Sequence, residues 1–168
     1  MLIAATLVFF PAMMAFAASS DFFTMTISNR VSIALVLGFV LLAAAAGVPA
    51  GAIAANLLCG AVALCVTFTL FAFGWIGGGD AKLAAATAVW LGFGHMADYG
   101  VISSVLGGVL TLAVIQMRGM TLPAALTGRD WFARLNNPAN GVPYGIALAA
   151  AGLAVFPDTQ LWNVVAAI

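Results

Sequence analysis

The sequence is poor in charged residues. It carries five Lys/Arg and five acidic residues among 168, or 6% of the chain, whereas soluble domains carry about 25%. All five acidic residues are Asp, Glu is absent, and the net charge is zero. A neutral chain without a basic cluster argues against nucleic acid as a partner. With 65% apolar residues and a mean hydropathy of +1.18, the chain is predicted to be an integral membrane protein with several spans.

Cysteine and histidine are also scarce. Cys59 and Cys65 lie six residues apart within one apolar run, with no His or carboxylate close by. We interpret them as packing residues, because this spacing does not fit a zinc site. The single histidine, His95, is predicted on the opposite membrane face from the aspartates discussed below, so no Ser/His/Asp set is available. We expect no metal and no organic cofactor.

Long apolar runs, in contrast, are abundant. A membrane-crossing helix needs about 20 residues, so the second, fourth and sixth runs are short. No alternating strand pattern occurs, which leaves the helix as the expected spanning form. We predict an all-α polytopic membrane protein, a single domain over residues 1–168 with about six transmembrane helices. The six runs are Leu2–Ser19, Val31–Ala46, Ala50–Trp75, Leu83–Phe93, Val101–Gln116 and Gly145–Phe156.

The basic residues support this count of spans. Six spans place every Lys and Arg on one side, which the positive-inside rule identifies as the cytoplasm. Asp21 and Asp80 fall on that side together. The basic residues are Arg30, Lys82, Arg118, Arg129 and Arg134.

Two connections between runs have predicted roles. Gly94–Gly100 is interpreted as a loop rather than as a proton relay, because small and polar residues link two spans there. Gly119–Asn140 is predicted to be a cytoplasmic loop. Within it, Arg129–Arg134 is predicted to form a short amphipathic helix along the membrane.

The stretch Gly77-Gly78-Gly79-Asp80 lies between two apolar runs. An Asp against hydrocarbon costs about 2.5–3.5 kcal/mol even on the mildest insertion scale, which points to a functional role. The preceding glycines let the backbone turn sharply and let a substrate approach. Asp21 likewise lies at the end of an apolar run. Two carboxylates that share one proton supply an acid and a base, so the pair predicts an aspartic protease site at a membrane surface.

These residues also carry a resemblance to a known family. Gly77–Asp80 fits the G-x-G-D signature of membrane aspartyl proteases, and Ala81–Leu83 continues it as in type IV prepilin peptidases. Asp21 followed by Ile27–Arg30 is similar to the family's second motif, an Asp followed by Ile-Pro-Asn, with Ser28 in place of the Pro. Pro143–Ala147 is similar to a third patch in its short members. The chain most resembles the small Flp/Tad-type peptidases.

The resemblance implies a set of roles. Asp21 and Asp80 would be the catalytic pair, and Gly77, Gly79, Lys82 and Asn29 would shape the site or bind substrate. Lys82 would either hold a carboxylate ionised or anchor to lipid headgroups, and we favour the anchor.

The implied substrate is a prepilin, whose short basic leader precedes an apolar helix. It would be cut after a Gly at the cytoplasmic face of the bacterial inner membrane. Two departures stand out. The first is that Phe22-Phe23-Thr24 replaces a more basic stretch after the first Asp. The second is that the Cys-rich segment of the large prepilin peptidases, which also have N-methyltransferase activity, is absent between the first apolar run and Val31. The resemblance therefore implies peptidase activity without N-methyltransferase activity.

The main alternative is a small proton- or ion-coupled transporter with Asp21 and Asp80 as ion sites and the glycines as a broken helix. That alternative predicts acidic residues near mid-membrane, whereas both lie at segment ends. A purely structural membrane subunit leaves the Gly-Gly-Gly-Asp stretch unexplained. The sequence leaves open the oligomeric state, the pilin that is cut, the resting distance between the aspartates and the role of the 118–142 loop.

Overall fold

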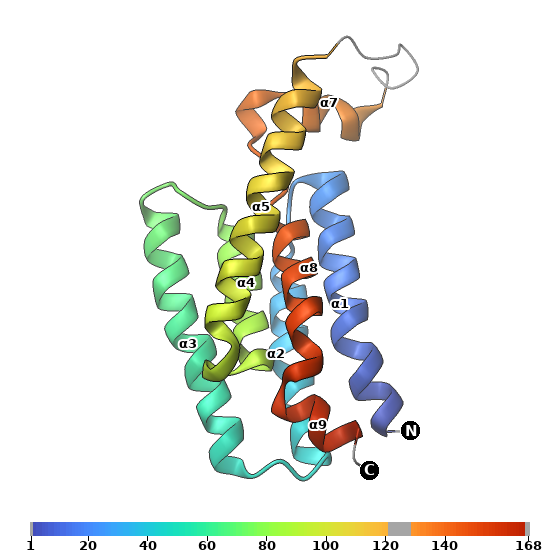
Figure 1. Ribbon diagram of the computed structural model, residues 1–168, viewed down its shortest axis with the longest axis vertical. Helices are drawn as coiled ribbons and strands as arrows, with labels where there is room; N and C mark the ends of the chain where they lie inside the picture. Colours follow the sequence, from blue (N-terminus) through green and yellow to red (C-terminus); the bar gives the residue numbers. More distant parts are fainter. Residues whose placement is uncertain (1, 121–128, 167–168) are drawn as a thin grey trace.

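The computed structural model describes residues 2–120 and 129–166, which form helices and no strand (Figure 1). The long helices are α1 (Leu2–Thr24), α2 (Asn29–Ala45), α3 (Ala50–Ala72), α4 (Gly78–Leu91), α5 (Met96–Arg118) and α8 (Gly145–Val155). The short ones are α7 (Asp130–Asn136), α9 (Gln160–Ala166) and the 3-10 turns η1 (Phe93–His95), η2 (Pro138–Asn140) and η3 (Phe156–Asp158).

Each of the six predicted apolar runs corresponds to one long helix. Three helical stretches are long and apolar enough to cross a membrane: Ala5–Thr24, Ala50–Ala72 and Phe93–Arg118. Asn29–Ala45 and Gly145–Asp158 are shorter apolar helices. The short helix α4 is buried along most of its length by its neighbours. The predicted all-α polytopic membrane protein is therefore confirmed.

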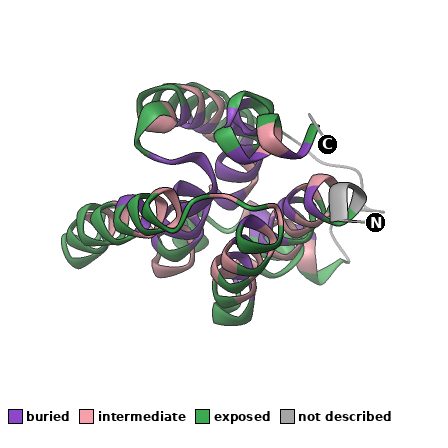
Figure 2. Ribbon diagram, turned by 90° about the horizontal axis from the view of Figure 1, so that it is seen from below, coloured by how far each residue is buried: buried purple, intermediate pink, exposed green. Residues whose placement is uncertain are grey.

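Helix α4 lies at the centre of the arrangement. It packs against α3 along its length and also against α2 and α8, while α1 and α5 pack against α8. Seen along the bundle, buried positions face inward between the helices and exposed positions cover the outer faces (Figure 2). The start of α1 and the end of α9 lie at one end of the bundle, and α7 lies at the other (Figure 1). The starts of α2 and α4 and the end of α5, with their basic residues, lie toward the α7 end.

Of the predictions for the connections between helices, one is confirmed and one is wrong in part. The short helix expected over Arg129–Arg134 is present as α7, one to two residues further along the chain. Part of the loop predicted over Gly119–Asn140, residues 121–128, lies outside the described residues. The loop prediction for Gly94–Gly100 is wrong from Met96 onward, where α5 begins. Asp98 occupies the first turn of that helix, where the helix dipole favours a negative charge.

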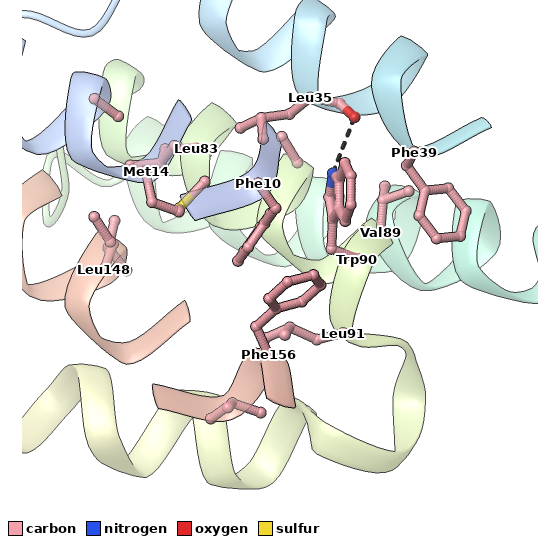
Figure 3. Close-up of a cluster of buried hydrophobic side chains, with 14 of the residues drawn as sticks. Phe10, Met14, Leu35, Phe39, Leu83, Val89, Trp90, Leu91, Leu148 and Phe156 are labelled. Atoms are coloured by element: carbon pink, nitrogen blue, oxygen red, sulfur yellow. Dashed lines mark hydrogen bonds between the residues drawn. The ribbon is translucent and has the colours of Figure 1, made fainter. Parts of the chain in front are cut away.

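An aromatic cluster fixes the half of the bundle away from the start of α4 (Figure 3). The fully buried Trp90 has its ring centroid 5.0 Å from that of Phe10, 5.7 Å from that of Phe39 and 5.9 Å from that of Phe156. Its indole Nε1–H donates a hydrogen bond to the Leu35 carbonyl oxygen at 3.0 Å. The cluster therefore ties α4 to α1, α2 and the turn η3 that follows α8.

We expect Trp90→Phe to destabilise the protein by roughly 1–3 kcal/mol, because it removes a buried hydrogen bond and leaves a cavity. The measurement is the thermal unfolding midpoint in detergent. Trp75→Phe is the control, since the Trp75 side chain is 73% exposed. Equal midpoints for the two variants would contradict the role given to the cluster.

Candidate active site

Asp21 lies in the last turn of α1, where its side chain is only 5% exposed. The backbone N–H of Gly145, at the start of α8, donates a hydrogen bond to its Oδ2 at 2.8 Å. A Cβ on Gly145 would lie 2.8 Å from that oxygen and 2.6 Å from Cδ1 of Ile27. A side chain there would displace the Asp21 carboxylate or the end of Ile27, so the lack of one at Gly145 helps to shape the site. In the sequence, Gly145 lies within the Pro143–Ala147 patch, whose resemblance to the family assigned no role to a single residue.

Asp80 is the third residue of α4, and Gly77 is the N-cap. The Asp80 carboxylate lies against the backbone of Gly77, on the side that the acidic residue of a capping box takes. A Cβ on Gly77 would lie 2.8 Å from Oδ2 of Asp80. The local sequence thus aims the carboxylate back over the helix start, where the helix dipole favours negative charge.

Ile27, in the link between α1 and α2, joins the two halves of the site. A Cβ on Gly79 would lie 3.2 Å from the Ile27 Cβ and 3.3 Å from its backbone nitrogen. The buried Ile27 therefore packs closely against both Gly79 and Gly145. These contacts bring the start of α4 to the end of α1. As a result, Asp21 and Asp80 face the same cleft.

Both aspartates line one cleft of about 1040 Å³. The cleft extends from the turn before α4 to Phe93 and Met96, beyond the other end of that helix. Its walls come from α3, α4, α5 and α8 and are mostly apolar. Tyr144 also lines it, and its hydroxyl donates to the carbonyl oxygen of Ser103 at 3.0 Å. The arrangement is a carboxylate pair at one end of a long apolar cleft.

Lys82 and Asn29 lie elsewhere. The Lys82 Nζ donates to Asn29 Oδ1 at 2.8 Å, and both side chains are exposed. They line a second groove, of about 490 Å³, between α2, α3 and α4 and not the cleft of the aspartates. Of the residues singled out from the sequence, Gly77 lies against Asp80 and lines the cleft, and Gly79 packs against Ile27. Lys82 and Asn29 form a pair with each other.

The short helix α7 docks beside the site. Trp131 packs against Phe22 and Phe23 at the end of α1, with ring centroids 5.2 Å and 6.1 Å apart. Arg118, the last residue of α5, donates from Nε to the Leu135 carbonyl oxygen at 2.9 Å. The segment after α7 then lines the cleft. Phe22 and Phe23, which stand where the resemblance led us to expect basic residues, therefore hold α7 in place.

Metal-ligating side chains do not gather near the aspartates. Within residues 2–120 and 129–166, no group of three His, Cys, Asp or Glu could hold a metal ion. Cys59 is buried on α3 and Cys65 is exposed, both as free thiols.

Comparison with known proteins gives one clear finding. The model of the type IV leader peptidase family matches residues 8–112, which include Asp21 and the Gly77–Asp80 stretch. Comparison with curated proteins and with solved structures gave no match. The match ends within α5, so Gly145 lies beyond it. It nevertheless covers well over half of the chain and both acidic segments that meet in the cleft, and the chain therefore belongs to the type IV leader peptidase family.

Proposed function

We propose that the protein is an aspartic endopeptidase that removes the leader from type IV prepilins of the Flp type. The observation that carries the proposal is the meeting of two carboxylates at one end of a single cleft, in a chain of this family. Asp21 and Asp80 are the catalytic pair. Gly77, Gly79 and Gly145 shape the site around them.

Two neighbouring carboxylates hold one proton between them, because like charges at short distance do not both ionise. The ionised carboxylate takes a proton from water as the water oxygen bonds to the scissile carbonyl carbon. The protonated carboxyl then gives its proton to the leaving nitrogen as the C–N bond breaks. The products are the leader with a new carboxyl end and the pilin with a new amino end. One proton is taken and one is given, so the pair is ready for another cycle.

The distribution of charge supports a cytoplasmic site in the bacterial inner membrane. The basic residues lie toward the end of the bundle that holds α7 and the starts of α2 and α4. The positive-inside rule assigns this end to the cytoplasm. A basic leader would reach the aspartates from water at this end, while the apolar part of the prepilin stays in the membrane. We propose peptidase activity alone, without N-methyltransferase activity.

The test is cleavage by the full chain in lipid vesicles. A Flp-type prepilin is added, and the products are identified by mass spectrometry. We expect one cut, after the Gly that precedes the apolar helix, and no cut in a prepilin with that Gly replaced by Leu. Vesicles without the protein are the control. Intact prepilin, together with an Asp80-dependent loss of a vesicle pH gradient, would instead establish the transporter alternative.

Lys82→Met is expected to change cleavage less than about fivefold, because an exposed pair contributes at most about 1 kcal/mol. Lys82 also pairs with Asn29 outside the cleft that holds the aspartates, so its loss leaves that cleft unchanged. Initial cleavage rates in vesicles measure this, with Asn29→Ala as the matched variant. A loss of two orders of magnitude in either would show that the pair acts on the aspartates.

A further inference from the structure

The cleft has an open side between α3 and α5. Helix α3 packs along α4 and has only sparse contacts with every other helix (Figure 1). Among its residues only Cys59 and Gly60 are buried. Helix α5 packs mainly against α8. The cleft thus separates two long helices that do not close against each other, although both are long and apolar enough to cross a membrane.

The wall on α3 carries a row of branched apolar side chains, and the wall on α5 contains a stretch of small residues. On α3, the cleft is lined by Val62, Val66 and Leu70, which recur every four residues on one face of the helix. On α5, the large Met96 and Tyr99 line the cleft near the start of the helix, and the small residues Gly100, Ser103 and Ser104 line it further along. A Cβ on Gly100 would meet no atom within 4 Å. Small residues on a membrane helix allow the backbone of another helix to approach closely.

The length of the cleft also suits a helix. It extends beside α4 from Asp80 in the first turn to Phe93 beyond the last. The 14 residues of α4 span about 21 Å, about two-thirds of the hydrocarbon core of a bilayer.

We propose that the cleft between α3 and α5 receives the apolar helix of the prepilin from the side, through the membrane. This inference rests on the proposed function and adds the place where the substrate binds. A helix docked there would begin next to Asp21 and Asp80. The residues that join the leader to the first turn of this helix would then lie at the two carboxylates. Binding energy from the apolar helix is then used to orient the scissile bond.

Two glycines of α5 provide a matched test. Gly100 and Gly108 are both exposed, and a Cβ on either would meet no atom within 4 Å, but only Gly100 lines the cleft. We expect Gly100→Leu to lower kcat/KM for full-length prepilin by about tenfold or more, as for a blocked central contact, and Gly108→Leu to leave it unchanged. The same variants are measured on a leader peptide that ends a few residues after the scissile bond. The loss in Gly100→Leu is expected to be much smaller on this peptide.

The outcomes separate the two proposals. If wild type cleaves neither substrate, the proposed function fails. If wild type cleaves both substrates, and Gly100→Leu cleaves full-length prepilin at the same rate as Gly108→Leu, the proposed docking site is wrong and the cleft holds lipid only. An equal loss on both substrates would also overturn it, because the residue would then act on the scissile segment itself.

Cross-linking locates the substrate directly. Val66 lines the cleft and is 56% exposed, whereas its neighbour Cys65 is exposed and does not line it. The full chain with Cys59→Ala and Asp80→Asn is incubated with a prepilin that carries one Cys in mid-helix, under copper–phenanthroline oxidation. We expect a disulfide when Val66→Cys and Cys65→Ala are added, and none through the native Cys65 alone. Equal cross-linking through both positions would overturn the proposal.

Discussion

Replacement of either Asp21 or Asp80 by Asn is expected to lower prepilin cleavage by about a thousandfold, since positioned acid–base groups contribute about 10²–10⁴. Asn keeps the shape of the side chain and can still accept the hydrogen bond that Gly145 donates to Asp21. It removes the proton that the pair shares. Initial rates in vesicles, with equal amounts of inserted protein, measure the loss.

The control is Asp98→Asn, because Asp98 lies in the first turn of α5, on an exposed surface. We expect this variant to cleave like wild type. We also expect the double variant at Asp21 and Asp80 to be no less active than either single variant, because residues that act as a unit are not additive. A single variant that retained a tenth of the activity, or a double variant far below both singles, would contradict the shared role.

Gly145→Ala has the second largest expected effect, a loss of about a hundredfold, as for a displacement of about 1 Å in a catalytic group. The added Cβ would lie 2.8 Å from Oδ2 of Asp21 and 2.6 Å from Ile27, closer than atoms in contact allow. The Asp21 carboxylate and the end of the Ile27 side chain must therefore shift, and the carboxylate moves relative to Asp80. The measurement is kcat on the short leader peptide.

Gly51→Ala is the matched control, because a Cβ at Gly51 would meet no atom within 4 Å. We expect it to leave kcat unchanged. Thermal unfolding of both variants separates a displaced carboxylate from an unfolded protein. If Gly145→Ala folds and cleaves at the wild-type rate, the contact between α8 and Asp21 has no part in catalysis.

The fold could be predicted largely from local properties of the sequence. Apolar run length and the spacing of the basic residues located all six long helices, because each helix satisfies its own backbone within one segment. The prediction failed for Met96–Gly100, where small and polar residues were interpreted as a loop. In the structure they form the first turns of α5, where the Asp98 charge suits the helix dipole.

The site could be predicted in part. Gly77, Gly79 and Asp80 lie together in the chain, and their local pattern already required a turn and a close approach. The bond between Gly145 and Asp21 joins residues 124 positions apart. That between Lys82 and Asn29 joins residues 53 positions apart. Such contacts depend on how helices pack, which no local pattern encodes, so the sequence indicated neither the bond from Gly145 to Asp21 nor the pairing of Lys82 with Asn29.

The transporter alternative also depends on tertiary geometry. It requires the aspartates to line a path near the middle of the membrane. In the structure, Asp21 lies in the last turn of α1 and Asp80 in the first turn of α4, and both lie at the same end of the bundle as α7 (Figure 1). This end position suits hydrolysis at the membrane surface, where water reaches the scissile bond.

The most direct test of the shared carboxylate pair is the pH dependence of kcat/KM. The substrate is a short leader peptide without Asp, Glu or His, so only the enzyme titrates. If one carboxylate must be ionised while the other is protonated, the profile is bell-shaped, with both limbs belonging to the pair. We predict this bell for wild type and its absence from the residual activity of Asp21→Asn and Asp80→Asn. A single rising limb in wild type, kept in either variant, would instead show one base acting alone and would contradict the two-carboxylate mechanism.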